Sequence, residues 1–203
     1  MLPTAIKNLI ADFASLPGVG NRSATRIVLY LLQQKNFSLS DFSMHLKDLR
    51  LKVKYCEQCF NYTEEELCDI CKNERRDQGK ILVVENALEI ENFETIGYSG
   101  LYHVLGGLIS PVQGVGASEI RIKELLNRVR VVGSEVEVIL ACATSLEGEA
   151  TSNYIKTVLA PQSYPQLKTL SVLARGLPSN TSVEYQDPNT LKYSFNNRQT
   201  LGF

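Results

Sequence analysis

Four cysteines, Cys56, Cys59, Cys68 and Cys71, are the residues of this chain whose types and spacing most clearly predict chemistry. They form two C-x2-C pairs separated by eight residues, and two such pairs can place four thiolates around one tetrahedral zinc ion. Because four thiolates fill every coordination position, we expect a structural site, not a catalytic one. A segment this short cannot bury enough apolar surface to fold alone, so zinc would supply the missing stability.

Three glutamates form a second candidate site. The apolar run Lys80–Glu85 predicts a buried strand that ends at Glu85, and the strand predicted over Glu135–Ala141 is followed by Glu147 and Glu149. Ligands of open α/β sheets gather at the carboxyl ends of the strands, so these carboxylates could bind a divalent metal for phosphate chemistry. A glutamate at a helix start also interacts favourably with the helix dipole, and the spacing leaves both interpretations open.

A third candidate site precedes the cysteines. Residues 4–15 have the apolar spacing of a helix, and the run Leu16–Gly20 (LPGVG) predicts a tight turn in which two glycines can adopt a positive φ. A second helix is expected to begin near Asn21, with Asn21 as a plausible N-cap. Helix, glycine turn and helix together form the pattern of a helix-hairpin-helix.

This hairpin has the chemistry of a phosphate-binding site. Gly18 and Gly20 would leave backbone N–H groups exposed at a helix N-terminus, where they can bind a phosphate oxygen. Arg22 and Arg26 are four residues apart and therefore share one face of the helix beside the turn. These four residues are our candidates for contact with the DNA backbone. A hairpin that serves only packing is the alternative.

The charge distribution favours an anionic partner for the first part of the chain. The net charge of the whole chain is −1, but residues 1–55 hold eight lysines and arginines and three acidic residues, a net charge of +5. The remainder has a net charge of −6. A polyanion would therefore meet the N-terminal segment, although a solvated charged surface would show the same pattern.

The rest of the chain alternates strand and helix patterns, which predicts a parallel sheet and an α/β fold. Ser40 or Asp41 is expected to cap a third N-terminal helix, and Ser118 a later one. Cys142 is expected to be an inert buried thiol. Besides the elements above, we predict helices over 38–55, 87–95, 118–130, about 149–159 and 189–197, and a strand over 168–174.

Composition places the chain among ordinary globular proteins. Its 203 residues are 44% hydrophobic and 21% charged, with no run of 18 apolar residues that would predict a membrane span. The first twenty residues lack the apolar core of a signal peptide. We therefore expect a cytoplasmic protein without a membrane partner, in which reduced thiols favour metal binding over disulfides.

Taken together, these motifs resemble the RecR family of bacterial recombination mediators over essentially the whole chain and in the family's order. The motifs that carry the resemblance are LPGVGNRSATR (16–26), the four cysteines, YHVLGGLIS (102–110), IKELL (122–126), LEGEA (146–150), RGLP (175–178) and Glu184-Tyr185.

The resemblance implies a DNA-binding protein that forms a ring, typically a homotetramer, around DNA. It implies joint action with RecO, and in many bacteria RecF, to help RecA displace single-stranded-DNA-binding protein at gaps. It assigns zinc to the four cysteines, DNA contact to Arg22 and Arg26, and the Toprim glutamate to Glu85. The implied domains are a helix-hairpin-helix domain (1–55), a four-cysteine zinc finger (56–79), a Toprim domain (80–174) and an oligomerisation segment (175–203).

One departure bears on catalysis. Toprim enzymes such as type IA topoisomerases carry an Asp-x-Asp just before their Glu-Gly-Glu-like sequence, and here those two positions are Ala143 and Ser145. Two hard ligands for Mg²⁺ are therefore missing, which favours a non-enzymatic adaptor whose Toprim glutamates lie on a partner surface. A metal-dependent Toprim enzyme acting on DNA is the alternative, and a zinc-stabilised interaction protein without DNA contact is a third hypothesis.

Overall fold

The computed structural model describes residues 2–34, 36–133, 135–160 and 162–200. Two compact units, Met1–Val53 and Lys54–Phe203, make up the chain, and each is described by itself. Lys35, one of the basic residues counted in the N-terminal segment, lies outside the described residues, as do residues 201–203 of the predicted oligomerisation segment. No helix among the described residues is long and apolar enough to cross a bilayer.

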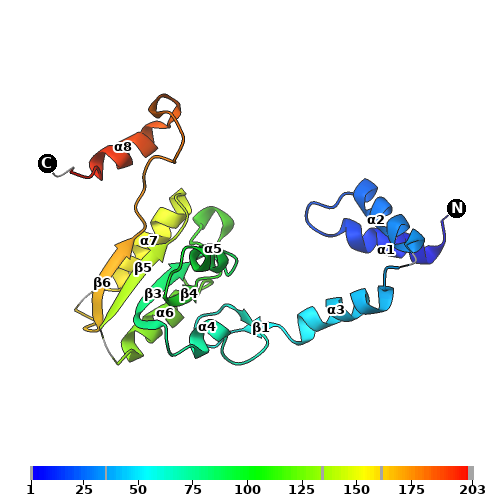
Figure 1. The fold of residues 1–203 in the computed structure, drawn as a ribbon, viewed down its shortest axis with the longest axis horizontal. Helices are drawn as coiled ribbons and strands as arrows, with labels where there is room; N and C mark the ends of the chain where they lie inside the picture. Colours follow the sequence, from blue (N-terminus) through cyan, green and yellow to red (C-terminus); the bar gives the residue numbers. More distant parts are fainter. Residues whose placement is uncertain (1, 35, 134, 161, 201–203) are drawn as a thin grey trace. The chain divides into compact units, whose positions relative to one another are not determined.

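The first unit contains three helices: α1 (Thr4–Ala14), α2 (Asn21–Gln33) and α3 (Leu39–Leu51), shown in blue and cyan in Figure 1. The buried side chains of α2 are Ala24, Val28 and Leu31, which recur at the three- and four-residue spacing of a helix face. The helical pattern in the sequence is therefore confirmed for this unit.

Two predicted caps in this unit are wrong. Gly20 is the N-cap of α2, and Asn21 is already the first helical residue. The N-cap of α3 is Ser38, whose hydroxyl oxygen accepts a hydrogen bond from the backbone N–H of Asp41 at 3.2 Å. Ser40 thus lies inside α3, because serine caps a helix only where its own backbone is extended.

The third helix is also shorter than its predicted range of 38–55. It ends at Leu51, and Lys54–Tyr55 form a short strand, β1, which pairs antiparallel with β2 (Tyr62–Thr63). This small ribbon frames the first cysteine pair. The second pair lies around the four-residue helix α4 (Asp69–Lys72).

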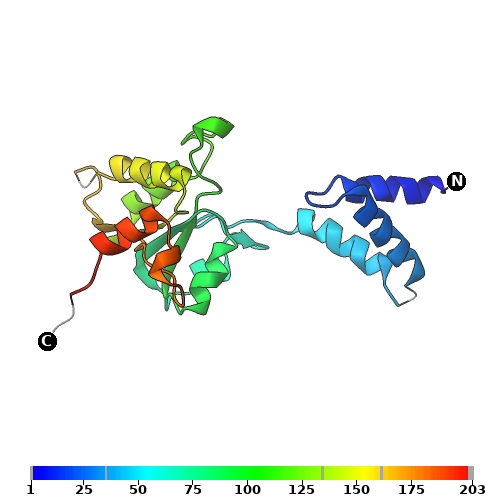
Figure 2. The ribbon, with the colours of Figure 1, turned by 90° about the horizontal axis from the view of Figure 1, so that it is seen from above.

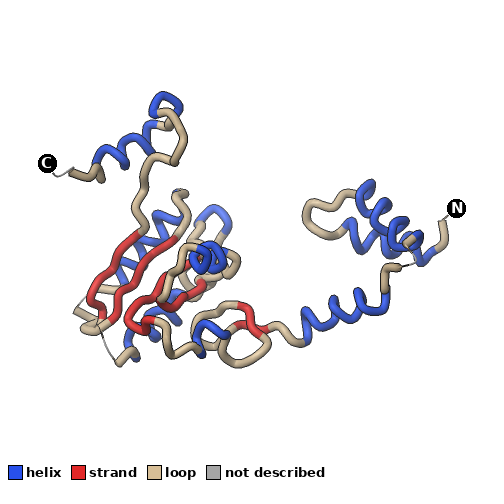
Figure 3. Tube along the Cα trace, in the orientation of Figure 1, coloured by secondary structure: helices blue, strands red, loops and turns tan. Residues whose placement is uncertain are grey.

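A four-stranded sheet forms the centre of the second unit. Its strands are β3 (Asp77–Val84), β4 (Gly100–Val104), β5 (Val136–Ala141) and β6 (Leu167–Val172), in the order β4-β3-β5-β6. All three pairings are parallel, which confirms the predicted parallel α/β sheet. Figure 3 shows the strands of this sheet side by side in red. Val84 pairs with Val104 on one side and Ala141 on the other, so these three strands end at one edge.

The alternation of side chains along β3 separates two cores. Ile81 and Val83 belong to a buried cluster shared with α6 (Ile122–Val131) and α7 (Leu146–Val158). Leu82 and Val84 belong to a second cluster, which includes Ile90 of α5 (Glu89–Thr95) and takes in Phe60 and Ile70 from the cysteine segment. Successive residues of a strand face opposite sides, so α6 and α7 cover one face and α5 with the cysteine segment covers the other.

Several predicted helix starts in this unit need correction. The helix predicted over 118–130 begins at Ile122 with Arg121 as its N-cap, and the Ser118 hydroxyl instead hydrogen-bonds Glu119 at 3.0 Å. The helix predicted at about 149–159 begins at Leu146. Short 3₁₀ turns add to the loops at Pro111–Gln113 and Val183–Tyr185.

The last helix, α8 (Pro188–Asn196), confirms the predicted C-terminal helix (Figure 2, red). Asp187 caps it by accepting hydrogen bonds from the backbone N–H groups of Asn189 and Thr190, both at 3.0 Å. Tyr193 of α8 donates its hydroxyl proton to Glu149 of α7 at 3.2 Å, so the C-terminal segment contacts the sheet domain through a polar side-chain pair.

Candidate metal centre and nucleic-acid interface

The first cysteine pair lies in a tight backbone loop. The N–H of Cys56 donates to the carbonyl of Asn61 at 2.7 Å, and the N–H of Phe60 donates back to the carbonyl of Cys56 at 3.0 Å. Phe60 has a φ of 65°, a left-handed conformation that is uncommon outside glycine and lets the chain reverse just after Cys59. The loop thereby directs both thiols of the pair to one side.

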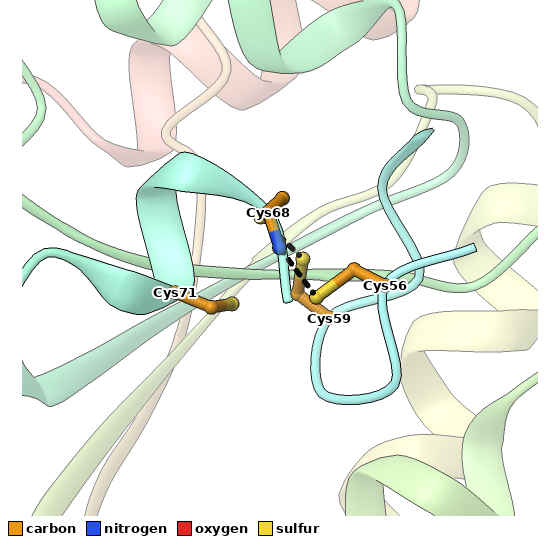
Figure 4. Close-up of side chains that lie close together, drawn as sticks. All are labelled: Cys56, Cys59, Cys68 and Cys71. Carbon is orange, nitrogen blue, oxygen red and sulfur yellow. Dashed lines mark hydrogen bonds between the residues drawn. The ribbon is translucent and has the colours of Figure 1, made fainter. Parts of the chain in front are cut away.

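The second pair uses the start of a helix. Cys68 is the N-cap of α4, and its carbonyl accepts from the N–H of Lys72 at 3.0 Å. Cys71 follows three residues later, on the same side of the helical turn. The N–H of Cys68 also points at the sulfur of Cys56 at 3.4 Å, the kind of N–H···S contact that orients thiolates in zinc knuckles (Figure 4).

The two pairs converge on one point. The four sulfurs lie within 4.8 Å of one another, and those of Cys59 and Cys68 are 3.5 Å apart. A Zn–S bond of about 2.3 Å in a tetrahedron places sulfurs about 3.8 Å apart, so the arrangement fits zinc. Within the described ranges, this is the only group of three or more metal-ligating side chains close enough to share an ion.

The thiols interact strongly even among themselves. The hydrogen bond between Cys59 and Cys68 raises the pKa of Cys59 and lowers the pKa of Cys68 to about 2. Negative charge therefore concentrates on one sulfur when no cation balances it, whereas zinc would hold all four as thiolates. Cys56 and Cys59 are completely buried, which makes this a closed structural centre without a position for substrate.

The metal centre is attached to the sheet through β4. The N–H of Val104 donates to the carbonyl of Cys59 at 2.8 Å, and the ring of Phe60 meets the ring of His103 edge-on at 5.5 Å. Arg121 lies over the rings of Phe60 and Tyr55, at 5.0 Å and 4.3 Å from their centres. No local pattern indicated that Arg121 and His103 support this segment, because they are far from it along the chain.

The turn between α1 and α2 depends on Gly18. The N–H of Val19 donates to the carbonyl of Leu16 at 3.1 Å, with Pro17 and Gly18 at the two central positions. Gly18 has a φ of +77°, which matches a turn that requires glycine at its third position. Gly20 has a φ of −81°, so only one of the two glycines uses the left-handed region.

The start of α2 presents several groups suited to an anion. Gly20 is the N-cap and has no side chain, so no side-chain oxygen accepts the first N–H groups of the helix. The first residues of the helix, 21–23, are exposed, and this end carries the positive pole of the helix dipole. Arg22 and Arg26 are both exposed, and neither forms an ion pair with any residue in the described part of the chain. The arrangement can bind a phosphate without contacting a base.

The three glutamates lie near one edge of the sheet, but they are not equivalent. Glu85 directly follows β3, and Glu147 lies in the first turn of α7. Glu149, in the same turn, forms an ion pair with Arg175 and also accepts the hydroxyl proton of Tyr193. These contacts lower the pKa of Glu149, and the Arg175 hydrogen bond is the largest cause. Glu149 is thus occupied by a cation of its own chain.

Three residues beside these glutamates have structural roles that the sequence did not reveal. Ser145 caps α7 by accepting the N–H of Gly148 at 3.1 Å. A side chain at Gly148 would collide with the carbonyl of Ala143, so the glycine allows the helix start to approach that backbone. Glu89, which sequence analysis missed, accepts the N–H of Glu85 at 3.1 Å, and burial raises its pKa.

Comparisons with known proteins agree with this organisation. Three family models match: the helix-hairpin-helix of RecR over residues 6–49, the four-cysteine zinc finger domain of RecR over 53–73 and the Toprim domain over 79–167. The zinc-finger match and the clustered cysteines identify one structural zinc site per chain.

Curated relatives match over the full length. A "Recombination protein RecR" of Streptococcus mutans is 40% identical over 202 residues, which cover 99% of this chain and 100% of the relative. Proteins of the same name from Tropheryma whipplei strain Twist and Streptococcus gordonii are each 41% identical, over 97% and 99% of this chain and 97% and 100% of the relatives. The chain therefore belongs to the RecR family of recombination proteins.

Proposed function

We propose that this protein is a non-enzymatic DNA-binding clamp and adaptor in recombinational DNA repair. It acts with RecO, and with RecF where that protein is present, to promote RecA loading on gaps coated with single-stranded-DNA-binding protein. The printed name of its full-length relatives supports a role in recombination. The helix-hairpin-helix match supports DNA as the ligand.

The start of α2 is the observation on which the proposal rests. Arg22 and Arg26 are exposed and have no carboxylate partner among the described residues, and the N–H groups after Gly20 have no side-chain cap. Phosphates are common to every sequence, so binding here is independent of sequence. Each duplex phosphate neutralised contributes a slope of about −0.9 to the plot of log affinity against log salt.

The clamp requires several copies of the chain to assemble. A single hairpin makes few phosphate contacts, so a ring of four copies would multiply weak contacts through avidity. We assign subunit exchange to residues 175–203 and the DNA contact to residues 1–55, with the zinc finger (56–79) and the Toprim domain (80–174) as the scaffold. The part of the chain after residue 55 has a net charge of −6 and suits a basic protein partner.

The Toprim glutamates fit a partner surface better than a two-metal site. Glu149 is paired with Arg175, and Ser145 is used as a helix cap. Two-metal phosphoryl transfer needs several carboxylates converging on ions about 4 Å apart. A metal-dependent Toprim enzyme would cleave or nick labelled gapped DNA with Mg²⁺ or Mn²⁺, and Glu85→Gln would abolish that cleavage.

The DNA contact is tested by the double variant Arg22→Ala, Arg26→Ala. We expect it to lose binding to short DNA in low salt while zinc content and assembly stay unchanged. Arg75→Ala with Lys123→Ala is the matched control, since it removes the same charge from two exposed residues of the other unit. Unchanged affinity of the first variant, or equal loss in both, would contradict the proposed interface.

The adaptor role needs a separate measurement. A fluorophore attached to single-stranded-DNA-binding protein reports the rate at which RecA displaces it from gapped DNA. The rate is compared with and without RecO and with and without this protein. We expect acceleration only when RecO and this protein are both present. Acceleration by the DNA-binding-deficient variant at full rate would contradict the clamp mechanism.

A further inference from the structure

Arg128 is a buried cation without an anionic partner among the described residues. Its side chain lies on α6 and the residue is only 8% exposed. One guanidinium nitrogen, Nη1, donates to the carbonyl of Tyr102 at 2.5 Å, and the other, Nη2, has no hydrogen-bond partner within the described structure. Arginine stays charged in proteins, so burying it without a counter-charge is costly.

Arg76 is an arginine of the same unit that does have an anionic partner. Its guanidinium forms an ion pair with Glu94, with Nη2 and Oε1 2.5 Å apart, and Nε donates to the carbonyl of Gly100 at 2.8 Å. No carboxylate of the described chain stands in that relation to Arg128. The counter-charge of Arg128 must therefore come from another kind of group.

Arg128 and the cysteine centre both bind the outer edge of β4. β4 is the end strand, and residues two apart in a strand direct their backbone groups to the same side. The carbonyl of Tyr102, which binds Arg128, and the N–H of Val104, which binds Cys59 at 2.8 Å, thus both face away from β3. Tyr102 and Val104 themselves are two residues, or about 7 Å, apart along the strand.

The charges of the two groups are complementary. Four thiolates around Zn²⁺ carry a net charge of −2, and three of the four cysteines are buried. Burial lowers the pKa of Arg128, and the cysteines oppose that effect, with Cys71 making the largest contribution among them. A buried dianion and a buried cation are each costly when no opposite charge is near, and each can balance part of the charge of the other.

We propose that Arg128 is the counter-charge of the zinc–thiolate centre, a positioning residue that stabilises the thiolates from the sheet side. Its positive charge would offset the net negative charge of the zinc–thiolate centre and make release of zinc less favourable. Removing a group of this kind around a metal site typically lowers metal affinity 10- to 100-fold.

The test compares three variants of the full-length protein. Arg128→Gln removes the charge and keeps a donor, Arg128→Lys keeps the charge, and Arg76→Gln breaks a partly exposed ion pair elsewhere in the unit. Zinc affinity is measured by competition with a chromogenic chelator of known affinity. We expect a 10- to 100-fold loss for Arg128→Gln, a loss below about threefold for Arg128→Lys, and no change for Arg76→Gln.

A spectroscopic measurement distinguishes an electrostatic effect of Arg128 on the metal centre from a loss of folding stability. Cobalt(II) replaces zinc in the wild-type protein and in the Arg128→Lys and Arg76→Gln variants, and the sulfur-to-cobalt charge-transfer bands are compared. We expect these bands to shift in Arg128→Lys, because the position of the positive charge changes, and to stay in place in Arg76→Gln. This measurement decides the matter if Arg128→Gln does not fold.

Two results would overturn the assignment. One is a folded Arg128→Gln protein that binds zinc within twofold of wild type but unfolds at a lower urea concentration, which would leave the Tyr102 carbonyl as the group that Arg128 serves. The other is cobalt bands that are identical in wild type and Arg128→Lys.

Discussion

Arg175, which follows β6, forms an ion pair with Glu149 in the first turn of α7 and lies over the ring of Tyr193 of α8, 4.7 Å from its centre. This one arginine therefore connects the glutamate that a Toprim enzyme would use to the C-terminal helix. A carboxylate in such a contact holds chain segments together, and a metal would have to displace the arginine before binding it.

Replacing Arg175 with alanine should release the C-terminal segment. We expect faster proteolysis and faster amide exchange at residues 188–196, because both Glu149 and Tyr193 lose their shared partner. Mass spectrometry after brief protease treatment measures this, with Lys192→Ala as a control that removes a charge from the same helix. Equal protection in wild type and Arg175→Ala would show that the ion pair does not hold α8.

Removing the zinc should unfold the cysteine segment and expose one edge of the sheet. Cys56→Ser should reduce bound zinc from one per chain to nearly none, because a structural zinc site needs its full ligand set. Elemental analysis and near-ultraviolet circular dichroism measure the change. Cys142→Ser is the matched control, since Cys142 is not part of the cluster, and we expect it to retain zinc. Zinc loss in both variants would contradict the assignment.

His103 should make stability depend on pH. Its Nε2 lies 2.8 Å from the carbonyl of Arg121 and therefore carries the proton, and burial lowers its pKa to about 3 from an ordinary value near 6.5. Between these values the unfolded chain binds a proton that the folded chain excludes. Stability is thus unaffected by this group above pH 6.5 and falls as pH decreases, by at most about 1.4 kcal/mol per pH unit.

Urea unfolding at pH 7.5 and 5.5 measures this effect. Zinc loss also weakens the fold in acid, so the comparison is between wild type and His103→Gln, which does not titrate. We expect the wild type to lose more stability than the variant across this interval. Parallel losses in the two proteins would show that His103 is not buried in its neutral form.

Replacing Gly18 with a residue that has a side chain should destabilise the first unit. Its φ of +77° lies in the left-handed region, so alanine there should cost about 1–2 kcal/mol, although open space surrounds the position. The free energy of unfolding of the full chain, followed by a probe in the first unit, measures this cost. A Gly18→Asn variant should lose less, because asparagine enters this region more readily, and equal stability of wild type and Gly18→Ala would contradict the turn geometry.

Replacing Gly20 with aspartate should raise the stability of α2 and lower the affinity for DNA. Aspartate there has room for its side chain and a backbone suited to a helix cap, so Gly20→Asp should stabilise α2 by a few tenths of a kcal/mol. The same carboxylate would occupy the first N–H groups and repel a phosphate, so DNA affinity should fall. Gly20→Asn caps without the charge and should bind more tightly than Gly20→Asp. DNA affinity that is unchanged in Gly20→Asp would contradict phosphate binding at this helix start.

Much of the fold follows from local patterns. The runs that became β3 and β5 are apolar because both of their faces are buried, and such runs can be recognised without a structure. Helix starts were less predictable. Asn21, Ser40 and Ser118 all have side chains suited to capping, but which residue adopts the extended backbone of a cap depends on where the preceding turn places the chain.

The amino-acid sequence by itself determined the zinc ligands, the hairpin and the order of strands and helices, because these depend on residue types at short spacing. The tertiary structure decided which distant groups each charged side chain meets. Glu149 and its ion-pair partner Arg175 are 26 residues apart, as are Arg128 and the Tyr102 whose carbonyl binds it, and only the parallel sheet brings each pair together. Pairing of buried or half-buried charges is a long-range property, since it depends on which strand edge lies beside which helix, and no local pattern encodes that.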